Sequence, residues 1–216
     1  MRTYISMIII GCLLASVPVI NLPLKWFETF FHEISHGIGF LLAGNELTGL
    51  KINWNGSGWI SFDGEENLFA TYSGYFGAPL WGSVIFLVGR EASDEIRNRF
   101  LLILATMIII VTFSLAEDIE TYIISGFLIL FLTIIYLEKT SRNAELMLEF
   151  IGIYIILNAI HTPLYILNDG NRVSDGSALE MLTNTPEMLY ILSWWLIALA
   201  CLFVIAIPSS NRRRVA

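Results

Sequence analysis

Two of the three histidines in the chain lie four residues apart, in the run His32-Glu33-Ile34-Ser35-His36. On a helix this spacing places both imidazoles on one face, close enough to bind one metal ion. Glu33 adds a carboxylate that can accept a proton from a metal-bound water. The H-E-x-x-H pattern is typical of zinc metallohydrolases, in which zinc lowers the pKa of the water and the glutamate is the general base. The pattern therefore predicts a zinc site with His32 and His36 as ligands and Glu33 as the catalytic base.

A structural polar cluster is the alternative interpretation, because H-E-x-x-H also arises by chance and a histidine on an apolar helix is usually a core residue. The run lies, however, inside the apolar segment 26–43. Ionisable side chains in the middle of a membrane cost several kcal/mol unless they are paired, and they are functional by default. The location therefore favours the metal site over the structural cluster.

Zinc in a hydrolase binds three protein ligands and keeps one position open for water. The third ligand must come from elsewhere in the chain, and it should be His, Asp or Glu. The candidates are one histidine, two aspartates of a polar connection and three acidic residues of a short loop: His161, Asp169, Asp175, and Glu117 with Asp118 and Glu120. A solvated turn is the favoured interpretation of the loop residues. For Asp175 the alternative is an N-cap of the helix that follows it.

The composition shows what kind of protein must position these side chains. Of 216 residues, 56% are hydrophobic and only 14% are charged, and the mean hydropathy is +0.69. This excludes a soluble domain, which carries about a quarter charged residues. The 19 acidic against 12 basic residues argue against a nucleic-acid partner. The two cysteines, Cys12 and Cys201, lie in apolar runs and form no disulfide framework. We expect a single membrane-embedded domain, residues 1–216, in a lipid bilayer.

Seven segments approach the roughly 20 apolar residues that a transmembrane helix needs. We expect an all-α polytopic protein with about seven spans, at 5–24, 26–43, 70–88, 100–115, 122–137, 150–167 and 188–207. Only six residues separate the fourth and fifth segments, so these two should form a helical hairpin.

Two connections are too polar to cross a membrane. In the first, two short alternating runs, 47–54 and 59–62, flank the turn sequence Asn55-Gly56-Ser57-Gly58, which predicts a small β-hairpin after the H-E-x-x-H helix. In the second, residues 168–186, Ser174 or Asp175 could cap a short helix that ends near Thr183.

Taken together, the motifs resemble the M50 (site-2 protease) metallopeptidases, and more closely their M50B-like branch. The resemblance spans residues 26 to 195. Four segments carry it: the run 31–37 with Gly44, the polar hairpin around 55–58, the glycine-rich span 73–79 with Gly82, and Ser174-Asp175-Gly176 followed by Leu179, Leu182-Thr183, Pro186 and Trp194-Trp195. In the glycine-rich span we expect Gly74, Gly77 and Gly82 to face a neighbouring helix, since small residues allow close helix packing in membranes.

The resemblance implies an intramembrane zinc endopeptidase that cleaves membrane-protein substrates. It also bears on the third ligand. The M50B-like pattern puts its recurring aspartate at Asp175, although Gly176 stands where the branch usually has alanine. The site-2 pattern of Asn158, Pro163 and Asp169 points to Asp169 instead. We choose Asp175, ahead of Asp169 and then His161.

Two orientations stay open for this multi-pass protein, which we expect in the cytoplasmic membrane. Seven spans place nine basic residues, including Arg212 to Arg214 at the C-terminus, on one side and three on the other. The positive-inside rule then makes the C-terminal side cytoplasmic. The resemblance implies instead that the hairpin faces the cytoplasm.

The alternative function is a non-proteolytic metal-binding membrane protein, either a transporter element or an inactive scaffold or sensor of the same fold. A transporter would usually carry polar residues in several spans and show an internal repeat. Here the intramembrane polar residues gather on one helix, with Asn158 and His161 on another, and no repeat is found. This favours the enzyme. In an enzyme, the exposed edge of the hairpin could pair with an extended substrate segment.

Overall fold

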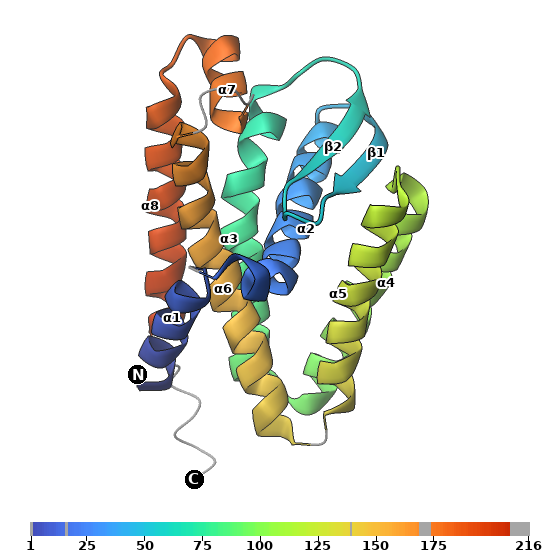
Figure 1. Cartoon of the computed structure of the whole chain (residues 1–216), viewed down its shortest axis with the longest axis vertical. Helices are drawn as coiled ribbons and strands as arrows, with labels where there is room; N and C mark the ends of the chain where they lie inside the picture. The colour runs from blue at the N-terminus through green and yellow to red at the C-terminus, as the bar shows by residue number, and fades with distance from the viewer. Residues whose placement is uncertain (1, 16, 139, 169–173, 208–216) are drawn as a thin grey trace.

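The computed structural model describes residues 2–15, 17–138, 140–168 and 174–207. In these ranges the chain forms one helical bundle with a small β-hairpin on one flank (Figure 1). The elements in chain order are α1 (Arg2–Ala15), α2 (Pro18–Leu42), β1 (Glu46–Ile52), β2 (Gly58–Asp63), α3 (Leu68–Glu91), α4 (Asp94–Leu115), α5 (Ile119–Leu137), α6 (Ser141–Asn168), α7 (Asp175–Thr183) and α8 (Glu187–Ala206). The mostly helical fold, the hairpin after the H-E-x-x-H helix and the short helix at 175–183 are as predicted.

The predicted division of the first two spans at Lys25 is wrong. The break between α1 and α2 falls near residue 17, and α2 runs without interruption through Pro23 and Lys25. Proline is well tolerated in the first turn of a helix, where Pro18 stands. The charge of Lys25 is accommodated because its Nζ donates to the carbonyl of Asn55, 3.1 Å away.

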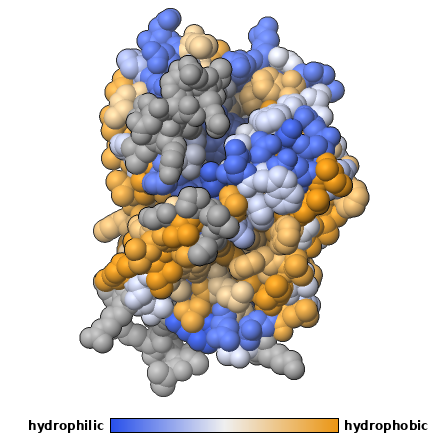
Figure 2. Space-filling model, viewed as in Figure 1, coloured by the Kyte–Doolittle hydropathy of each residue, from blue (hydrophilic) through white to orange (hydrophobic). Residues whose placement is uncertain are grey.

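The count of seven spans is not confirmed. Among the described residues, four helical segments are long and apolar enough to cross a membrane: α4, α5, residues Ser141–Pro163 of α6, and α8. With 14 residues, α1 is only about 21 Å long, shorter than the ~30 Å hydrocarbon core. The helix α2 is long enough, but Lys25, Glu28 and Glu33 make it more polar than a typical span. On the face drawn in Figure 2, a hydrophobic band separates the hydrophilic upper part of the molecule from a smaller hydrophilic patch at the bottom.

The helices around the H-E-x-x-H motif approach each other closely at glycines. A Cβ added to Gly82 of α3 would lie 2.7 Å from the carbonyl oxygen of Gly152 in α6. A Cβ on Gly77 would lie 2.1 Å from Ser35 Oγ in α2, and one on Gly74 would also meet side chains of α2. Gly74, Gly77 and Gly82 therefore face neighbouring helices, as predicted. The small residues bring α2, α3 and α6 together as the central layer of the bundle.

The hairpin packs on α2, with β1 and β2 antiparallel from Ile52 opposite Gly58 to Glu46 opposite Asp63 and a bulge between Leu47 and Gly49 that shifts the register. Its turn is held by side chains of α2: Thr29 Oγ1 donates to the carbonyl of Gly56 at 2.8 Å, and Trp26 Nε1 to that of Trp54 at 3.3 Å. These bonds fix the hairpin beside the turn of α2 that precedes the histidines.

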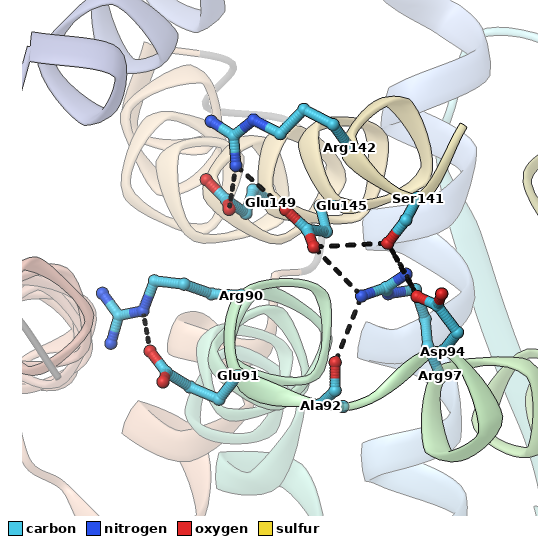
Figure 3. Close-up of polar contacts among 9 residues, drawn as sticks. All are labelled: Arg90, Glu91, Ala92, Asp94, Arg97, Ser141, Arg142, Glu145 and Glu149. Carbon is cyan, nitrogen blue, oxygen red and sulfur yellow. Dashed lines mark hydrogen bonds and ion pairs between the residues drawn. The ribbon is translucent and has the colours of Figure 1, made fainter. Parts of the chain in front are cut away.

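A polar cluster at the opposite end of the molecule joins α3, α4 and α6 (Figure 3). Arg97 is its centre, only 3% exposed, and donates to the carbonyl of Ala92 at 3.1 Å, to Asp94 at 2.7 Å and to Glu145 at 3.3 Å. Ser141 also bonds Asp94, at 2.7 Å. The cluster ties the α4–α5 hairpin to the start of α6.

Candidate metal centre

His32 and His36 lie one turn apart on α2, with their Nε2 atoms 3.0 Å from each other. Both residues are buried, at 8% and 5% exposure. The helix α3 covers them at Gly74, where an added Cβ would lie 2.2 Å from His36 Nε2 and 2.7 Å from His32 Nε2. Only glycine at this position leaves room for the two rings.

Asp175 completes the group. Its Oδ2 lies 3.1 Å from Nε2 of His32 and 3.1 Å from Nε2 of His36. The three residues can each offer one ligand atom within 4.8 Å of the others. The N-cap role is taken by Ser174, whose Oγ accepts a hydrogen bond from the amide of Ser177 at 3.0 Å. Asp175 is therefore the first residue of α7, and its carboxylate faces the histidines.

The charges of the group favour an ionised Asp175. Burial acts to raise the pKa of its carboxyl, but when the histidines carry a proton on Nε2, the charge of His36 and hydrogen bonds with both histidines outweigh burial and hold the pKa below the usual aspartate value. A metal ion would take the place of those protons. An ionised carboxylate is the form that ligates a metal ion.

The position of α7 is set by α3 and α8. Leu179 of α7 is fully buried in a cluster with Tyr75 of α3 and Trp194 of α8, and Ser174 Oγ donates to Glu187 of α8 at 2.5 Å. A Cβ on Gly176 would lie 2.5 Å from Cγ of Glu187. The glycine at 176, where the M50B-like pattern usually has alanine, is thus explained by the side chain of Glu187.

The three side chains fit a zinc ion. Nδ1 of His36 lies 2.8 Å from the carbonyl oxygen of Ala70 and so must donate to it, which leaves the lone pair on Nε2 for a metal. Ligand atoms around a tetrahedral zinc, with bonds of 2.0–2.1 Å, are about 3.3 Å apart. The three atoms here are 3.0 to 3.1 Å apart, and two imidazole nitrogens with one carboxylate oxygen are a donor set that zinc accepts.

Glu33 follows His32 on α2 and is buried at 5% exposure. The first residue of β2 lies against it: a Cβ on Gly58 would be 3.1 Å from Glu33 Cγ and 2.7 Å from Thr29 Cγ2. Within the described ranges no hydrogen bond to the Glu33 carboxylate is found. The carboxylate is therefore available to accept a proton.

The other candidates for the third ligand do not join this group. In the part of the chain that the structure describes, the group comprises His32, His36 and Asp175, and His161 on α6 is not part of it. Asp169 lies outside the described residues.

The three acidic residues at the connection of α4 to the first turn of α5 hold the hairpin instead. Glu117 accepts from Ser61 Oγ at 2.6 Å, and Asp118 pairs with Lys51 at 3.1 Å. Glu120 accepts the backbone N–H of Trp54. The interpretation of this loop as a solvated turn missed these contacts, because their partners lie more than 50 residues earlier in the chain.

Sequence reasoning missed Glu28, which lies one turn before His32 and is 3% exposed. Asn158 of α6 donates to Glu28 Oε2 at 2.8 Å. The four-residue spacing from Glu28 to His32, the same as from His32 to His36, is the signal that could have revealed it.

A helical bundle with apolar helices long enough to cross a membrane, and a group of two histidines and one aspartate inside it, has the features expected of a membrane metallopeptidase. The model of the family described as Peptidase M50B-like matches residues 4–205. The chain belongs to this family, and the resemblance found in its motifs is confirmed. No curated protein and no solved structure matches the chain significantly.

Proposed function

We propose that this chain is an intramembrane zinc endopeptidase that hydrolyses peptide bonds of membrane-protein substrates, and that it is a multi-pass protein of the cytoplasmic membrane. The observation that carries the proposal is the convergence of Asp175 Oδ2 on both histidine nitrogens, at 3.1 Å each, at the helix that also carries Glu33. Membership of a peptidase family supports the same reaction.

In this proposal His32, His36 and Asp175 hold the metal, and Glu33 is the general base. Zinc, when bound, would supply Lewis acidity and lower the pKa of a coordinated water. Glu33 accepts a proton from the attacking water while the oxygen of that water adds to the carbonyl carbon of the scissile bond. The same carboxyl then delivers that proton to the leaving amide nitrogen as the carbon–nitrogen bond breaks.

The hairpin supports a way of presenting the substrate. A transmembrane helix hides its peptide bonds within its own hydrogen bonds, so a segment must unwind before it is cut. Among the described residues β2 pairs only with β1, so its other edge has no strand partner and could accept an extended segment as an added strand. Gly58, at the start of β2, lies against Glu33, so a strand on that edge would run toward the base. Trp54 and Trp59, 44% and 45% exposed, would contact the substrate or anchor the hairpin at the membrane interface.

The experiment compares the wild type with Glu33→Gln. Purified protein is reconstituted in liposomes with a panel of tagged single-span membrane proteins, and fragments are identified by mass spectrometry. Because Glu33 is not a ligand, the variant should keep its zinc but cleave about 10²–10⁴-fold more slowly. Glu149→Gln is the matched control. It changes a buried glutamate of α6 that lies in the polar cluster of Figure 3, away from the histidines, and the variant should cleave at the wild-type rate.

Two results would count against the proposal. Cleavage by Glu33→Gln at near the wild-type rate would show that Glu33 is not the base. Zinc binding by the wild type without cleavage of any substrate in the panel would favour the alternative, a non-proteolytic metal-binding protein of the same fold.

A further inference from the structure

The buried carboxylate of Glu28 has no role in the reaction described above. Glu28 is 3% exposed, and its one hydrogen bond within the described residues comes from Asn158 Nδ2, at 2.8 Å. A carboxylate has about four acceptor sites, so most of its capacity is unused. A charged group buried in apolar surroundings is costly unless its hydrogen bonds are made. Packing of α2 against α6 alone would not require a carboxylate here.

One turn later on the same helix, His32 lacks a hydrogen-bond partner, within the described ranges, for one of its ring nitrogens. Its Nε2 faces Asp175 and His36, while its Nδ1 is buried and has no hydrogen-bond partner among the described residues. The neighbouring His36 differs, because its Nδ1 donates to the carbonyl of Ala70 at 2.8 Å. Histidines that ligate a metal almost always donate their second N–H to a carboxylate, a carbonyl or a water.

The two groups lie on the same face of α2. Residues four apart on a helix are neighbours, and helical side chains lean toward the N-terminus, so the His32 ring leans over the turn that carries Glu28. A third polar group is also unsatisfied: Tyr154, one turn before Asn158 on α6, is 1% exposed, and its hydroxyl has no partner in the described part of the chain. Several unsatisfied polar groups around one site are what a buried bridging water requires.

We infer that Glu28 is a positioning residue for the metal centre: through one bridging water, its carboxylate accepts the hydrogen bond that Nδ1–H of His32 donates. This fixes the tautomer of His32 that keeps a lone pair on Nε2, and it orients the ring toward Asp175 and His36. Asn158 holds the carboxylate from α6. The inference rests on the proposed function, because it assumes that His32 ligates a metal.

The test measures metal binding rather than cleavage. Zinc affinity is determined by chelator competition on purified protein, and the visible absorption spectrum of the Co²⁺-loaded protein reports the ligand geometry. Glu28→Gln keeps the size of the side chain, but it removes the negative charge and replaces one of the two carboxylate oxygens with an NH2 group that cannot accept a hydrogen bond. We expect zinc binding 10–100-fold weaker than in the wild type, together with an altered Co²⁺ spectrum. Glu28→Asp, which keeps the charge, should recover part of the affinity.

Glu149→Gln is the control for the loss of a buried glutamate elsewhere in the protein, and its zinc affinity should stay within twofold of the wild type. If Glu28→Gln does not fold, Asn158→Ala tests the same arrangement by removing the amide that orients Glu28, and should weaken zinc binding in the same direction. Unchanged zinc affinity and Co²⁺ spectrum in a folded Glu28→Gln or Asn158→Ala protein would overturn the inference. A wild type that binds no zinc would instead overturn the proposed function itself.

Discussion

Substitution of Gly74 by alanine should weaken zinc binding at the metal centre without unfolding the protein. The added Cβ would lie 2.2 Å from His36 Nε2 and 2.7 Å from His32 Nε2. Ordinary van der Waals contacts of a Cβ begin at 3.4 Å. Either α3 or the rings must therefore move by about 1 Å, several times the ~0.2 Å within which metal–ligand distances are normally held.

The expected loss follows from this displacement. Changes that disturb the orientation of metal ligands typically weaken metal binding by about 10–100-fold, and a hundredfold weaker binding of zinc corresponds to about 2.7 kcal/mol. The helix itself should persist, because alanine is about 1 kcal/mol more favourable than glycine inside a helix.

Zinc affinity by chelator competition and thermal unfolding in detergent test this prediction together. Gly126→Ala on α5 is the matched control, because a Cβ there meets no atom within 4 Å. Zinc affinity of Gly74→Ala within threefold of the wild type, with unchanged thermal stability, would refute the reasoning that α3 encloses the two histidines at this glycine.

Two further predictions concern the packing around the site. Gly77→Leu should reduce the yield of folded protein in detergent far more than Gly77→Ala, because even the Cβ lies 2.5 Å from Ser35 Cβ; equal thermal stability of Gly77→Leu and wild type would contradict the packing of α3 on α2. Arg97→Met should lower the free energy of unfolding by about 3 kcal/mol, because it breaks a buried ion pair. This value is the low end of the usual range, since the side chain of one partner, Asp94, is 67% exposed. An unchanged midpoint of thermal unfolding for Arg97→Met would show that the polar cluster does not stabilise the fold.

Features with local signals could be predicted from the sequence. The Asn-Gly turn indicates the hairpin because few residue pairs adopt its backbone conformation, and Gly56 indeed has φ 78°. Ser174 was correctly considered as a cap because its hydroxyl bonds an amide only three residues away. The glycines of α3 were expected to face other helices, since close packing in membranes requires small side chains.

Features that depend on distant partners could not be predicted. The charge of Lys25 suggested the end of a span, but its partner, the carbonyl of Asn55, is 30 residues further along the chain. The bond between Asn158 and Glu28 joins residues 130 apart. Asp175 and Asp169 were equally suited by chemistry, and the choice of Asp175 depended on a family pattern. The fold places Asp175 at the histidines, 139 residues from His36.

The measurement that tests the central claim most directly is the zinc content of the purified protein, determined by elemental analysis for the wild type beside His32→Ala and Asp175→Ala. The account predicts one zinc ion per chain in the wild type, and zinc lost or bound far more weakly in both variants. A wild type without zinc when purified and after incubation with zinc, or an Asp175→Ala protein that retains one zinc with wild-type affinity, would contradict it.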